Sequence, residues 1–215
     1  PDVTVRHVLT MTSGGTLVTQ PSTRPPKRIG DDTPPEPPDE YVRHDAGEKG
    51  SPDGYGISIE PGSTFYYDGA PADHLADVIA KVSGRTSHEF MMAEVAGALG
   101  CETFRYQPEG VDSDGNVRVG GSLLLSCRDA ARLGQLYLNR GRWKGEQLLA
   151  ESYVAEASTS SPRNKGYGFL WWLNADGAVP DAPASMFFAA GALGQFCFVL
   201  PDHDMVVATM GFGRN

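Results

Sequence analysis

The chain has 215 residues, of which 40% are hydrophobic and 21% are charged, and its formal net charge at pH 7 is −9. That length and apolar content suit a single globular domain with a sizeable core. The negative charge disfavours nucleic acid as a partner, because an acidic surface repels phosphate, and no apolar run is long enough to cross a bilayer.

The first part of the chain combines a short helix with a proline-rich segment. Val5, Val8 and Leu9 recur at helical spacing, and residues 13–15 end that helix with a serine and two glycines. Residues 20–40 are rich in proline, which excludes a regular helix or a central strand and predicts a long loop. Because both flanks read as parts of one domain, an insertion is favoured over a linker between two domains.

Helices with clear start and stop signals follow. An apolar stripe predicts a helix over residues 71–84, between a proline and a glycine, and a capping box of Thr86 and Glu89 starts the next helix. A third helix is predicted over residues 126–139 and a short fourth near residues 152–157. The stripe of the first of these helices consists of Leu75, Val78, Ile79 and Val82.

Beyond residue 158 the sequence changes to short aromatic and β-branched segments separated by Gly, Pro and Asp. These segments, GYGFLWWLN, MFFAAG, GQFCFVLP and DMVVATMG, predict antiparallel strands. The predicted fold class is therefore α+β, a single domain with a helical lobe over about residues 1–157 and sheet strands over about residues 165–211. In a strand, Trp171 and Trp172 would point to opposite faces of the sheet.

Self-contained catalytic and metal-binding motifs are absent from the sequence. It contains no G-x-S-x-G, H-E-x-x-H or S-x-x-K segment and no glycine loop of the kind that cradles phosphate. The five histidines show no ligand spacing and the three cysteines form no C-x-x-C pair, so neither a metal site nor a disulfide framework is predicted. No cofactor is predicted.

Five segments, in the same order, resemble the serine β-lactamase and penicillin-binding-protein superfamily in its class C-like branch. They run nearly from end to end: VTVRHVLTMTSG, EPGSTFYYDGAPADHLADVIAKVSG, GGSLLLSCRDAARLGQLYLNRGRWKGEQLL, GYGFLWWLN and AAGALGQFCFVLPDHDMVVATMG. Within the branch, the chain is most similar to esterases and 6-aminohexanoate-oligomer hydrolases. The resemblance implies a β-lactamase/transpeptidase-like fold, in which an antiparallel sheet is flanked by helices and joined by a helical lobe.

The resemblance gives Tyr67 a chemical role. It falls on the tyrosine of the family's Tyr-x-Asn motif, whose phenol lies beside the nucleophilic serine and the lysine of Ser-x-x-Lys. A serine hydroxyl is a poor nucleophile until a base takes its proton, and a nearby ammonium would ease that transfer through the phenol. Tyr67 would then pass the proton to the leaving group, while Tyr66 packs. On the residues alone, core packing of Tyr67 is the open alternative.

The family's third motif, Lys-Thr-Gly or His-x-Gly, corresponds here to residues 189–191. Gly191 would let a substrate approach the strand closely, and the N–H of Ala192 would be one oxyanion donor beside the serine's own N–H. Ala190 and Trp172 complete the predicted substrate-binding residues. Trp172 could line an apolar acyl pocket, with core packing as the alternative for it and close strand packing as the alternative for the Ala-Ala-Gly segment.

Two departures from the family pattern bear on activity. The asparagine of Tyr-x-Asn is replaced by Gly69, and the cationic residue of the third motif is replaced by Ala189. Both losses argue against efficient β-lactamase or transpeptidase action and fit an esterase or amidase with a more apolar acyl pocket.

The family also carries Ser-x-x-Lys and strands before the first matched segment and a helix after the last. We therefore expect a fragment, incomplete at both ends of the domain, that folds poorly and is inactive alone. The longer protein is expected to be a serine hydrolase that acts on a small ester or amide through an acyl-serine. A catalytically inactive, ligand-binding relative is the alternative. Family resemblance favours a periplasmic or secreted location; substrate and oligomeric state stay open.

Overall fold

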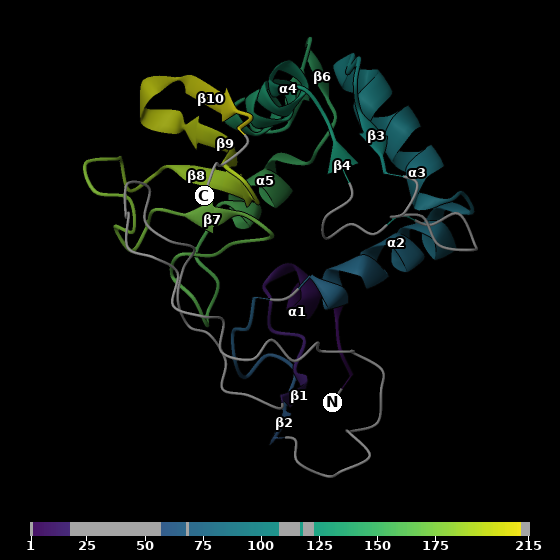
Figure 1. The fold of residues 1–215 in the computed structure, drawn as a ribbon, viewed down its shortest axis with the longest axis vertical. Helices are drawn as coiled ribbons and strands as arrows, with labels where there is room; N and C mark the ends of the chain where they lie inside the picture. The colour runs from purple at the N-terminus through teal and green to yellow at the C-terminus, as the bar shows by residue number, and fades with distance from the viewer. Residues whose placement is uncertain (1, 18–56, 68, 108–116, 118–122, 212–215) are drawn as a thin grey trace.

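The structure is a computed structural model that describes residues 2–17, 57–67, 69–107, 117 and 123–211. These residues form helices and antiparallel sheets that are joined by turns and loops (Figure 1). No helix among the described residues is both long and apolar enough to cross a membrane. The predicted proline-rich insertion of residues 20–40 lies outside the described residues.

The predicted helices are present, and their ends follow the predicted signals. Thr86 and Glu89 form the capping box in full, the Ser126 hydroxyl accepts a hydrogen bond from the Asp129 N–H, and Gly84 ends its helix with φ of 69°. The α-helices are α1 (Val5–Leu9), α2 (Ala70–Ser83), α3 (Ser87–Phe90), α4 (Cys127–Leu138) and α5 (Glu151–Ala157). A π-helical segment, Met91–Gly97, continues α3.

The buried face of α2 differs from the predicted apolar stripe. Val82 is 82% exposed and Val78 is 40% exposed, whereas Ala72 and Ala76 are buried. Since α2 contacts α1 and α3, its small residues form the face that is closest to the neighbouring helices. The apolar stripe therefore does not mark the buried face of α2, because periodicity identifies an apolar stripe but not the face that its neighbours cover.

Four antiparallel strands form the main sheet, in the spatial order β10-β9-β8-β7. They are β7 (Trp172–Leu173), β8 (Phe187–Gly191), β9 (Gln195–Leu200) and β10 (Met205–Thr209). A 3-10 helix, Pro201–His203, connects the last two. The small two-stranded sheets are β1 (Gly15–Leu17) with β2 (Ile57–Ile59), β3 (Arg105–Tyr106) with β4 (Leu123–Leu124), and β5 (Arg142–Trp143) with β6 (Glu146–Gln147).

Among the residues that the structure describes, the core has two apolar clusters, and the adjacent tryptophans belong to different ones. Trp171 packs with the cluster that includes Ala157 of α5, whereas Trp172 packs with the cluster that includes Met11. This confirms that the two side chains point in opposite directions. The first cluster consists of Ala157, Phe169, Trp171, Leu173, Phe187 and Val199, and the second of Met11, Phe65, Tyr167, Trp172, Met186 and Phe188.

Helix α4 packs closely on β9 and β10 through Gly134 (Figure 1). A Cβ atom on Gly134 would lie 2.7 Å from Val206 Cγ1 and 2.8 Å from Cys197 Sγ, so this position accepts only hydrogen. The Cys197 thiol donates to the carbonyl of Ala130, one turn earlier on α4 (3.3 Å). The helix is thereby held against β9 and the edge strand β10.

A buried carboxylate ties the start of α4 to the loop before β3. Asp129 accepts hydrogen bonds from the Thr103 N–H (2.8 Å) and hydroxyl (2.5 Å), from the Glu102 N–H (3.2 Å) and from Arg132 Nη1 (2.5 Å). Burial alone would raise the pKa of Asp129, but these hydrogen bonds outweigh it and hold the pKa at about 2.

Candidate active site

Tyr67 lies at the end of the segment that joins β2 to α2. The N–H of Tyr66 donates to the carbonyl of Met11 (2.8 Å), so the turn that follows α1 holds this segment in place. Phe65 is buried at 7% exposure, whereas Tyr67, two residues later, is 40% exposed, and Tyr66 is half-buried. The segment is thus anchored in the core and presents the Tyr67 ring at the surface.

The buried side of the Tyr67 ring lies against two other rings. Its centroid is 5.1 Å from that of Trp172, at an interplanar angle of 37°, and 6.0 Å from that of Tyr167, at 78°. Tyr167 and Trp172 meet edge to face at 4.8 Å, and Phe65 meets Tyr167 at 5.2 Å. We call Phe65, Tyr67, Tyr167 and Trp172 the ring cluster. Its other members cover one side of the Tyr67 ring and leave the rest of that ring accessible.

Tyr167 is the member of the ring cluster that sequence reasoning missed. It is 1% exposed, and burial raises the pKa of its phenol well above the usual range, an effect that a negative charge on Tyr67 strengthens. A Tyr between two glycines in GYGFLWWLN was the available signal, because glycine on both sides indicates a backbone that is closely packed.

The predicted substrate-binding residues lie on two neighbouring strands: Trp172 is on β7, whereas the others lie on β8 and in the turn that follows it. Trp172, which contacts Tyr67, pairs across the sheet with Phe188, three residues before Gly191. Ala190 is half-buried and packs against the same apolar cluster as Trp172. Gly191 and Ala192 are exposed at the end of β8. The structure thus brings Tyr67 and Trp172 into direct contact and places the other predicted residues on the neighbouring strand.

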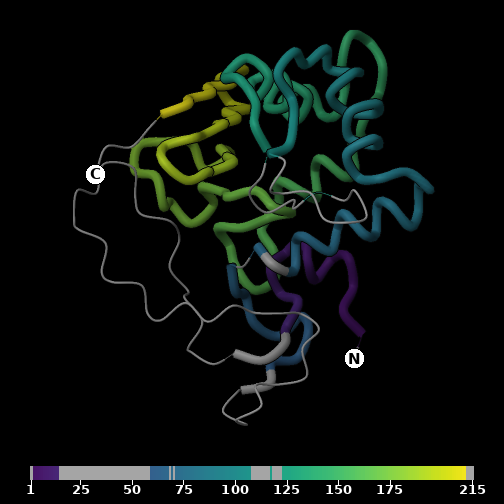
Figure 2. The backbone as a smooth tube through the Cα atoms, turned by 45° about the vertical axis from the view of Figure 1, so that its right-hand side comes forward, coloured from purple at the N-terminus to yellow at the C-terminus, as the bar shows by residue number. Residues whose placement is uncertain are grey.

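Trp172 links Tyr67 to β8, because it contacts the Tyr67 ring and pairs with Phe188, but its side chain is only 6% exposed. The Trp172 ring therefore packs beneath Tyr67 and exposes little surface to a substrate. In Figure 2 a green segment lies between the purple and blue N-terminal elements and the yellow strands. Trp172 packs in one cluster with Met11 of the N-terminal part and Phe188 of β8, so its side chain joins the two parts of the chain.

The two positions that depart from the family pattern supply no polar side chain to this site. Gly69 is the N-cap of α2 and makes no side-chain capping bond, and Ala189 is exposed on β8. Within the described ranges, no group of three or more His, Cys, Asp or Glu side chains is placed to hold a metal ion.

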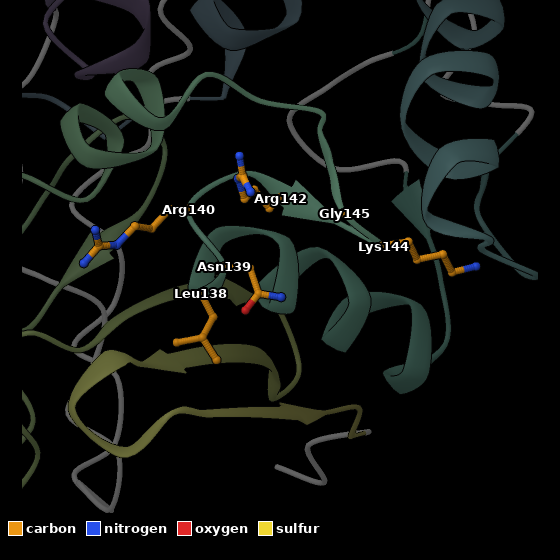
Figure 3. A pocket seen from close by; sticks show the side chains of 6 residues that line it. All are labelled: Leu138, Asn139, Arg140, Arg142, Lys144 and Gly145. Atoms are coloured by element: carbon orange, nitrogen blue, oxygen red, sulfur yellow. The ribbon is translucent and has the colours of Figure 1, made fainter.

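A surface depression with a volume of about 410 Å³ lies elsewhere, between the end of α4 and the β5–β6 hairpin. Its basic side chains point in different directions (Figure 3): Arg140 pairs with Glu151 (3.2 Å), and Arg142 Nε donates to Gln147 (3.0 Å). Because these charges do not converge, the depression offers no focused anion site. Its lining residues are Leu138, Asn139, Arg140, Arg142, Lys144 and Gly145.

The family model named Beta-lactamase matches residues 1–211, nearly the whole chain. The chain belongs to the Beta-lactamase family. This membership and the arrangement of helices and antiparallel strands confirm the predicted α+β, β-lactamase/transpeptidase-like fold. No curated protein matches the chain significantly.

Solved structures of this family have the same fold at low sequence identity. A Bacillus anthracis protein proposed to be a 6-aminohexanoate-dimer hydrolase is 21% identical, with a TM-score of 0.64 over 95% of this chain and 54% of its own. A β-lactamase from Mycobacterium bovis is 19% identical, with a TM-score of 0.64 over 99% of this chain and 68% of its own.

A third structure is that of EstCE1, described as a hydrolase with promiscuous acyltransferase activity. It is 18% identical, with a TM-score of 0.62 over 96% of this chain and 66% of its own. This Beta-lactamase family chain therefore spans about half to two thirds of the length of these structural relatives, two of which are named as hydrolases.

Proposed function

We propose that the protein that carries this chain is a serine hydrolase that cleaves a small ester or amide through an acyl-serine intermediate. The observation that carries the proposal is the geometry of Tyr67, whose ring is held by buried aromatic residues yet remains 40% exposed. Its resemblance to the tyrosine of the family's Tyr-x-Asn motif makes it our candidate for proton transfer. A tyrosine that only filled the core would be covered on both sides. Hydrolases among the structural relatives support the same class of reaction.

In the proposed mechanism, the nucleophilic serine and the lysine of Ser-x-x-Lys come from polypeptide outside these 215 residues, which contain no such motif. The Tyr67 phenolate takes the proton of the serine hydroxyl as the serine oxygen bonds to the substrate carbonyl carbon. The Tyr67 phenol then gives that proton to the departing alkoxide or amine. A water molecule cleaves the acyl-serine bond, which releases the acid and restores the serine.

Residues of β8 would bind the acyl group during these steps. The N–H of Ala192 would donate to the oxyanion, and Gly191 would keep the strand clear of side-chain atoms. With Gly69 and Ala189 in place of the family's amide and cation, this part of the site offers no side-chain charge to a substrate carboxylate. An uncharged ester or amide is therefore the proposed substrate class.

The experiment is to replace Tyr67 by phenylalanine in the full-length protein and to measure p-nitrophenyl ester hydrolysis and fluorophosphonate labelling. Loss of a general acid–base group is expected to lower kcat by about 10²- to 10⁴-fold. Tyr66→Phe, which removes the hydroxyl of the adjacent half-buried ring, is the matched control and should change kcat far less. Labelling and turnover that stay unchanged in Tyr67→Phe would remove the basis for the proposal.

The replacements at Gly69 and Ala189 favour one alternative, a catalytically inactive protein that binds a ligand at the same site. The residue at the serine position of Ser-x-x-Lys decides between the two, because any residue other than a nucleophile there excludes the acyl-serine. A full-length protein that binds a ligand yet resists fluorophosphonate would establish the alternative.

A further inference from the structure

Tyr167 is the central member of the ring cluster. Its ring contacts all three others, with centroid distances of 5.2 Å to Phe65, 6.0 Å to Tyr67 and 4.8 Å to Trp172. All three contacts are close to edge-on, with interplanar angles of 60°, 78° and 83°. Edge-to-face contact directs the positive rim of one ring at the negative face of another and so favours a defined relative orientation.

The backbone around Tyr167 is held firmly. Its carbonyl accepts from the Ser161 N–H (2.8 Å), its N–H donates to the Asn164 carbonyl (3.3 Å), and it forms a bridge with Trp172. Both flanking glycines are buried, and a Cβ on Gly166 would lie 2.7 Å from a carboxylate oxygen of Asp176. The segment thus has little room to move, so the Tyr167 ring is held in a fixed position.

The orientation of the Tyr67 ring depends on neighbours that are fixed in this way. It lies at the surface, it is 40% exposed, and the helix that follows begins at Gly69 without a side-chain capping bond. Its ring contacts include those with Tyr167 and Trp172, both of which are buried. We propose that Tyr167 is a positioning residue that holds the Tyr67 ring in the orientation needed for proton transfer, an inference that rests on the proposed function.

The chemistry of the two phenols fits this division of roles. Burial raises the pKa of Tyr167, and a negative charge on Tyr67 raises it further. Tyr167 therefore stays neutral when Tyr67 carries a charge, and it acts through its ring without exchanging protons itself. A displacement of about 1 Å at a reacting group can cost about 100-fold in rate, so loss of a fixed neighbour should be visible in kcat.

The test uses three variants of the full-length protein. Tyr167→Leu removes the ring, Tyr167→Phe keeps it, and Phe187→Leu is the matched control. Phe187 is 4% exposed and contacts Trp171 edge to face at 5.2 Å in the other apolar cluster, without belonging to the ring cluster. The first readout is the NMR signal of the Tyr67 ring in protein with ¹³C-labelled tyrosine, identified by its loss in Tyr67→Phe. The second is kcat and KM for ester hydrolysis.

Tyr167→Leu is expected to move the Tyr67 signal toward that of a mobile, exposed tyrosine and to lower kcat about 100-fold, with KM changed only a few-fold. Tyr167→Phe should keep the signal and kcat close to wild type. Phe187→Leu should lose thermal stability while keeping the Tyr67 signal. If Tyr167→Leu does not fold, Tyr167→Met replaces it, because methionine adapts to the vacated volume.

Two results would overturn the inference. One is an unchanged Tyr67 signal without the Tyr167 ring, whatever happens to the activity. The other is an equal loss of kcat in Phe187→Leu, which would assign the effect to general destabilisation. The proposed function fails separately, through unchanged hydrolysis in Tyr67→Phe, and the NMR signal alone then decides whether Tyr167 positions that ring.

Discussion

Replacement of Asp129 by asparagine should destabilise the protein in a pH-dependent way. The Asp129 side chain is fully buried and accepts hydrogen bonds from Thr103, Glu102 and Arg132, which lower its pKa from 3.8 to about 2 despite the opposing effect of burial. Because the folded-state pKa lies below the unfolded value, the stabilisation is complete above the unfolded value and disappears as pH falls toward about 2.

The expected magnitude follows from that pKa difference. Nearly two pKa units, at about 1.4 kcal/mol each, correspond to about 2.5 kcal/mol of folding free energy carried by the ionised carboxylate. Asparagine cannot ionise, and it turns an amide N–H₂ toward a site built from donors. The free energy of unfolding of Asp129→Asn should therefore be lower than that of wild type by at least about 2 kcal/mol at pH 7. This difference should shrink by about 2 kcal/mol as the pH approaches 2.

The assay is urea denaturation of the full-length protein and the variant at a series of pH values from 7 to 2.5, followed by tryptophan fluorescence. Asp202→Asn, at an exposed acid in the turn before β10, is the control and should leave the free energy of unfolding nearly unchanged. A difference between wild type and Asp129→Asn that stays constant over the whole pH series would refute the role assigned to the ionised carboxylate.

Three further predictions concern packing and thiol reactivity. Gly134→Ala should lower the free energy of unfolding by about 1–3 kcal/mol, although alanine favours helix, because its Cβ would meet Val206 and Cys197; a rise in Tm would contradict this contact. Asn174→Ala should cost about 3 kcal/mol and speed hydrogen exchange of the Val179 amide, which donates to the Asn174 side chain (2.7 Å); unchanged exchange would disprove that link. With a thiol reagent at pH 8, exposed Cys127 should be modified first, while Cys197, whose pKa burial raises to about 11, stays unmodified until unfolding; mass spectrometry reporting the reverse order would contradict the burial.

Local signals in the sequence were sufficient for most of the fold. The capping residues Thr86 and Ser126 mark helix starts because their hydroxyls bond to N–H groups within the next turn, which is a property of a few consecutive residues. The opposite directions of the Trp171 and Trp172 side chains, the second of which begins β7, followed from alternation in the same way. Such features need no knowledge of the rest of the molecule.

Features that depend on distant neighbours were not accessible in the same way. The exposed Val82 belongs to an apolar stripe, but only the packing of α2 against α1 and α3 decides that Ala76 is buried in its place. Tyr167 escaped notice for the same reason, because its significance comes from its contact with Tyr67. Family resemblance selected Tyr67 as a candidate, and the geometry added the rings that hold it.

The ring cluster also bears on the order of folding. Tyr67 and Tyr167 are separated by 100 residues in the sequence, whereas β8, β9 and β10 follow one another through short turns. Closing a long loop costs more chain entropy than closing a hairpin, so we expect the hairpins to form before the distant rings meet. We therefore expect the candidate site to take shape on a sheet that already exists, so that a slow folding step would delay the contact between Tyr67 and Tyr167 without delaying strand formation.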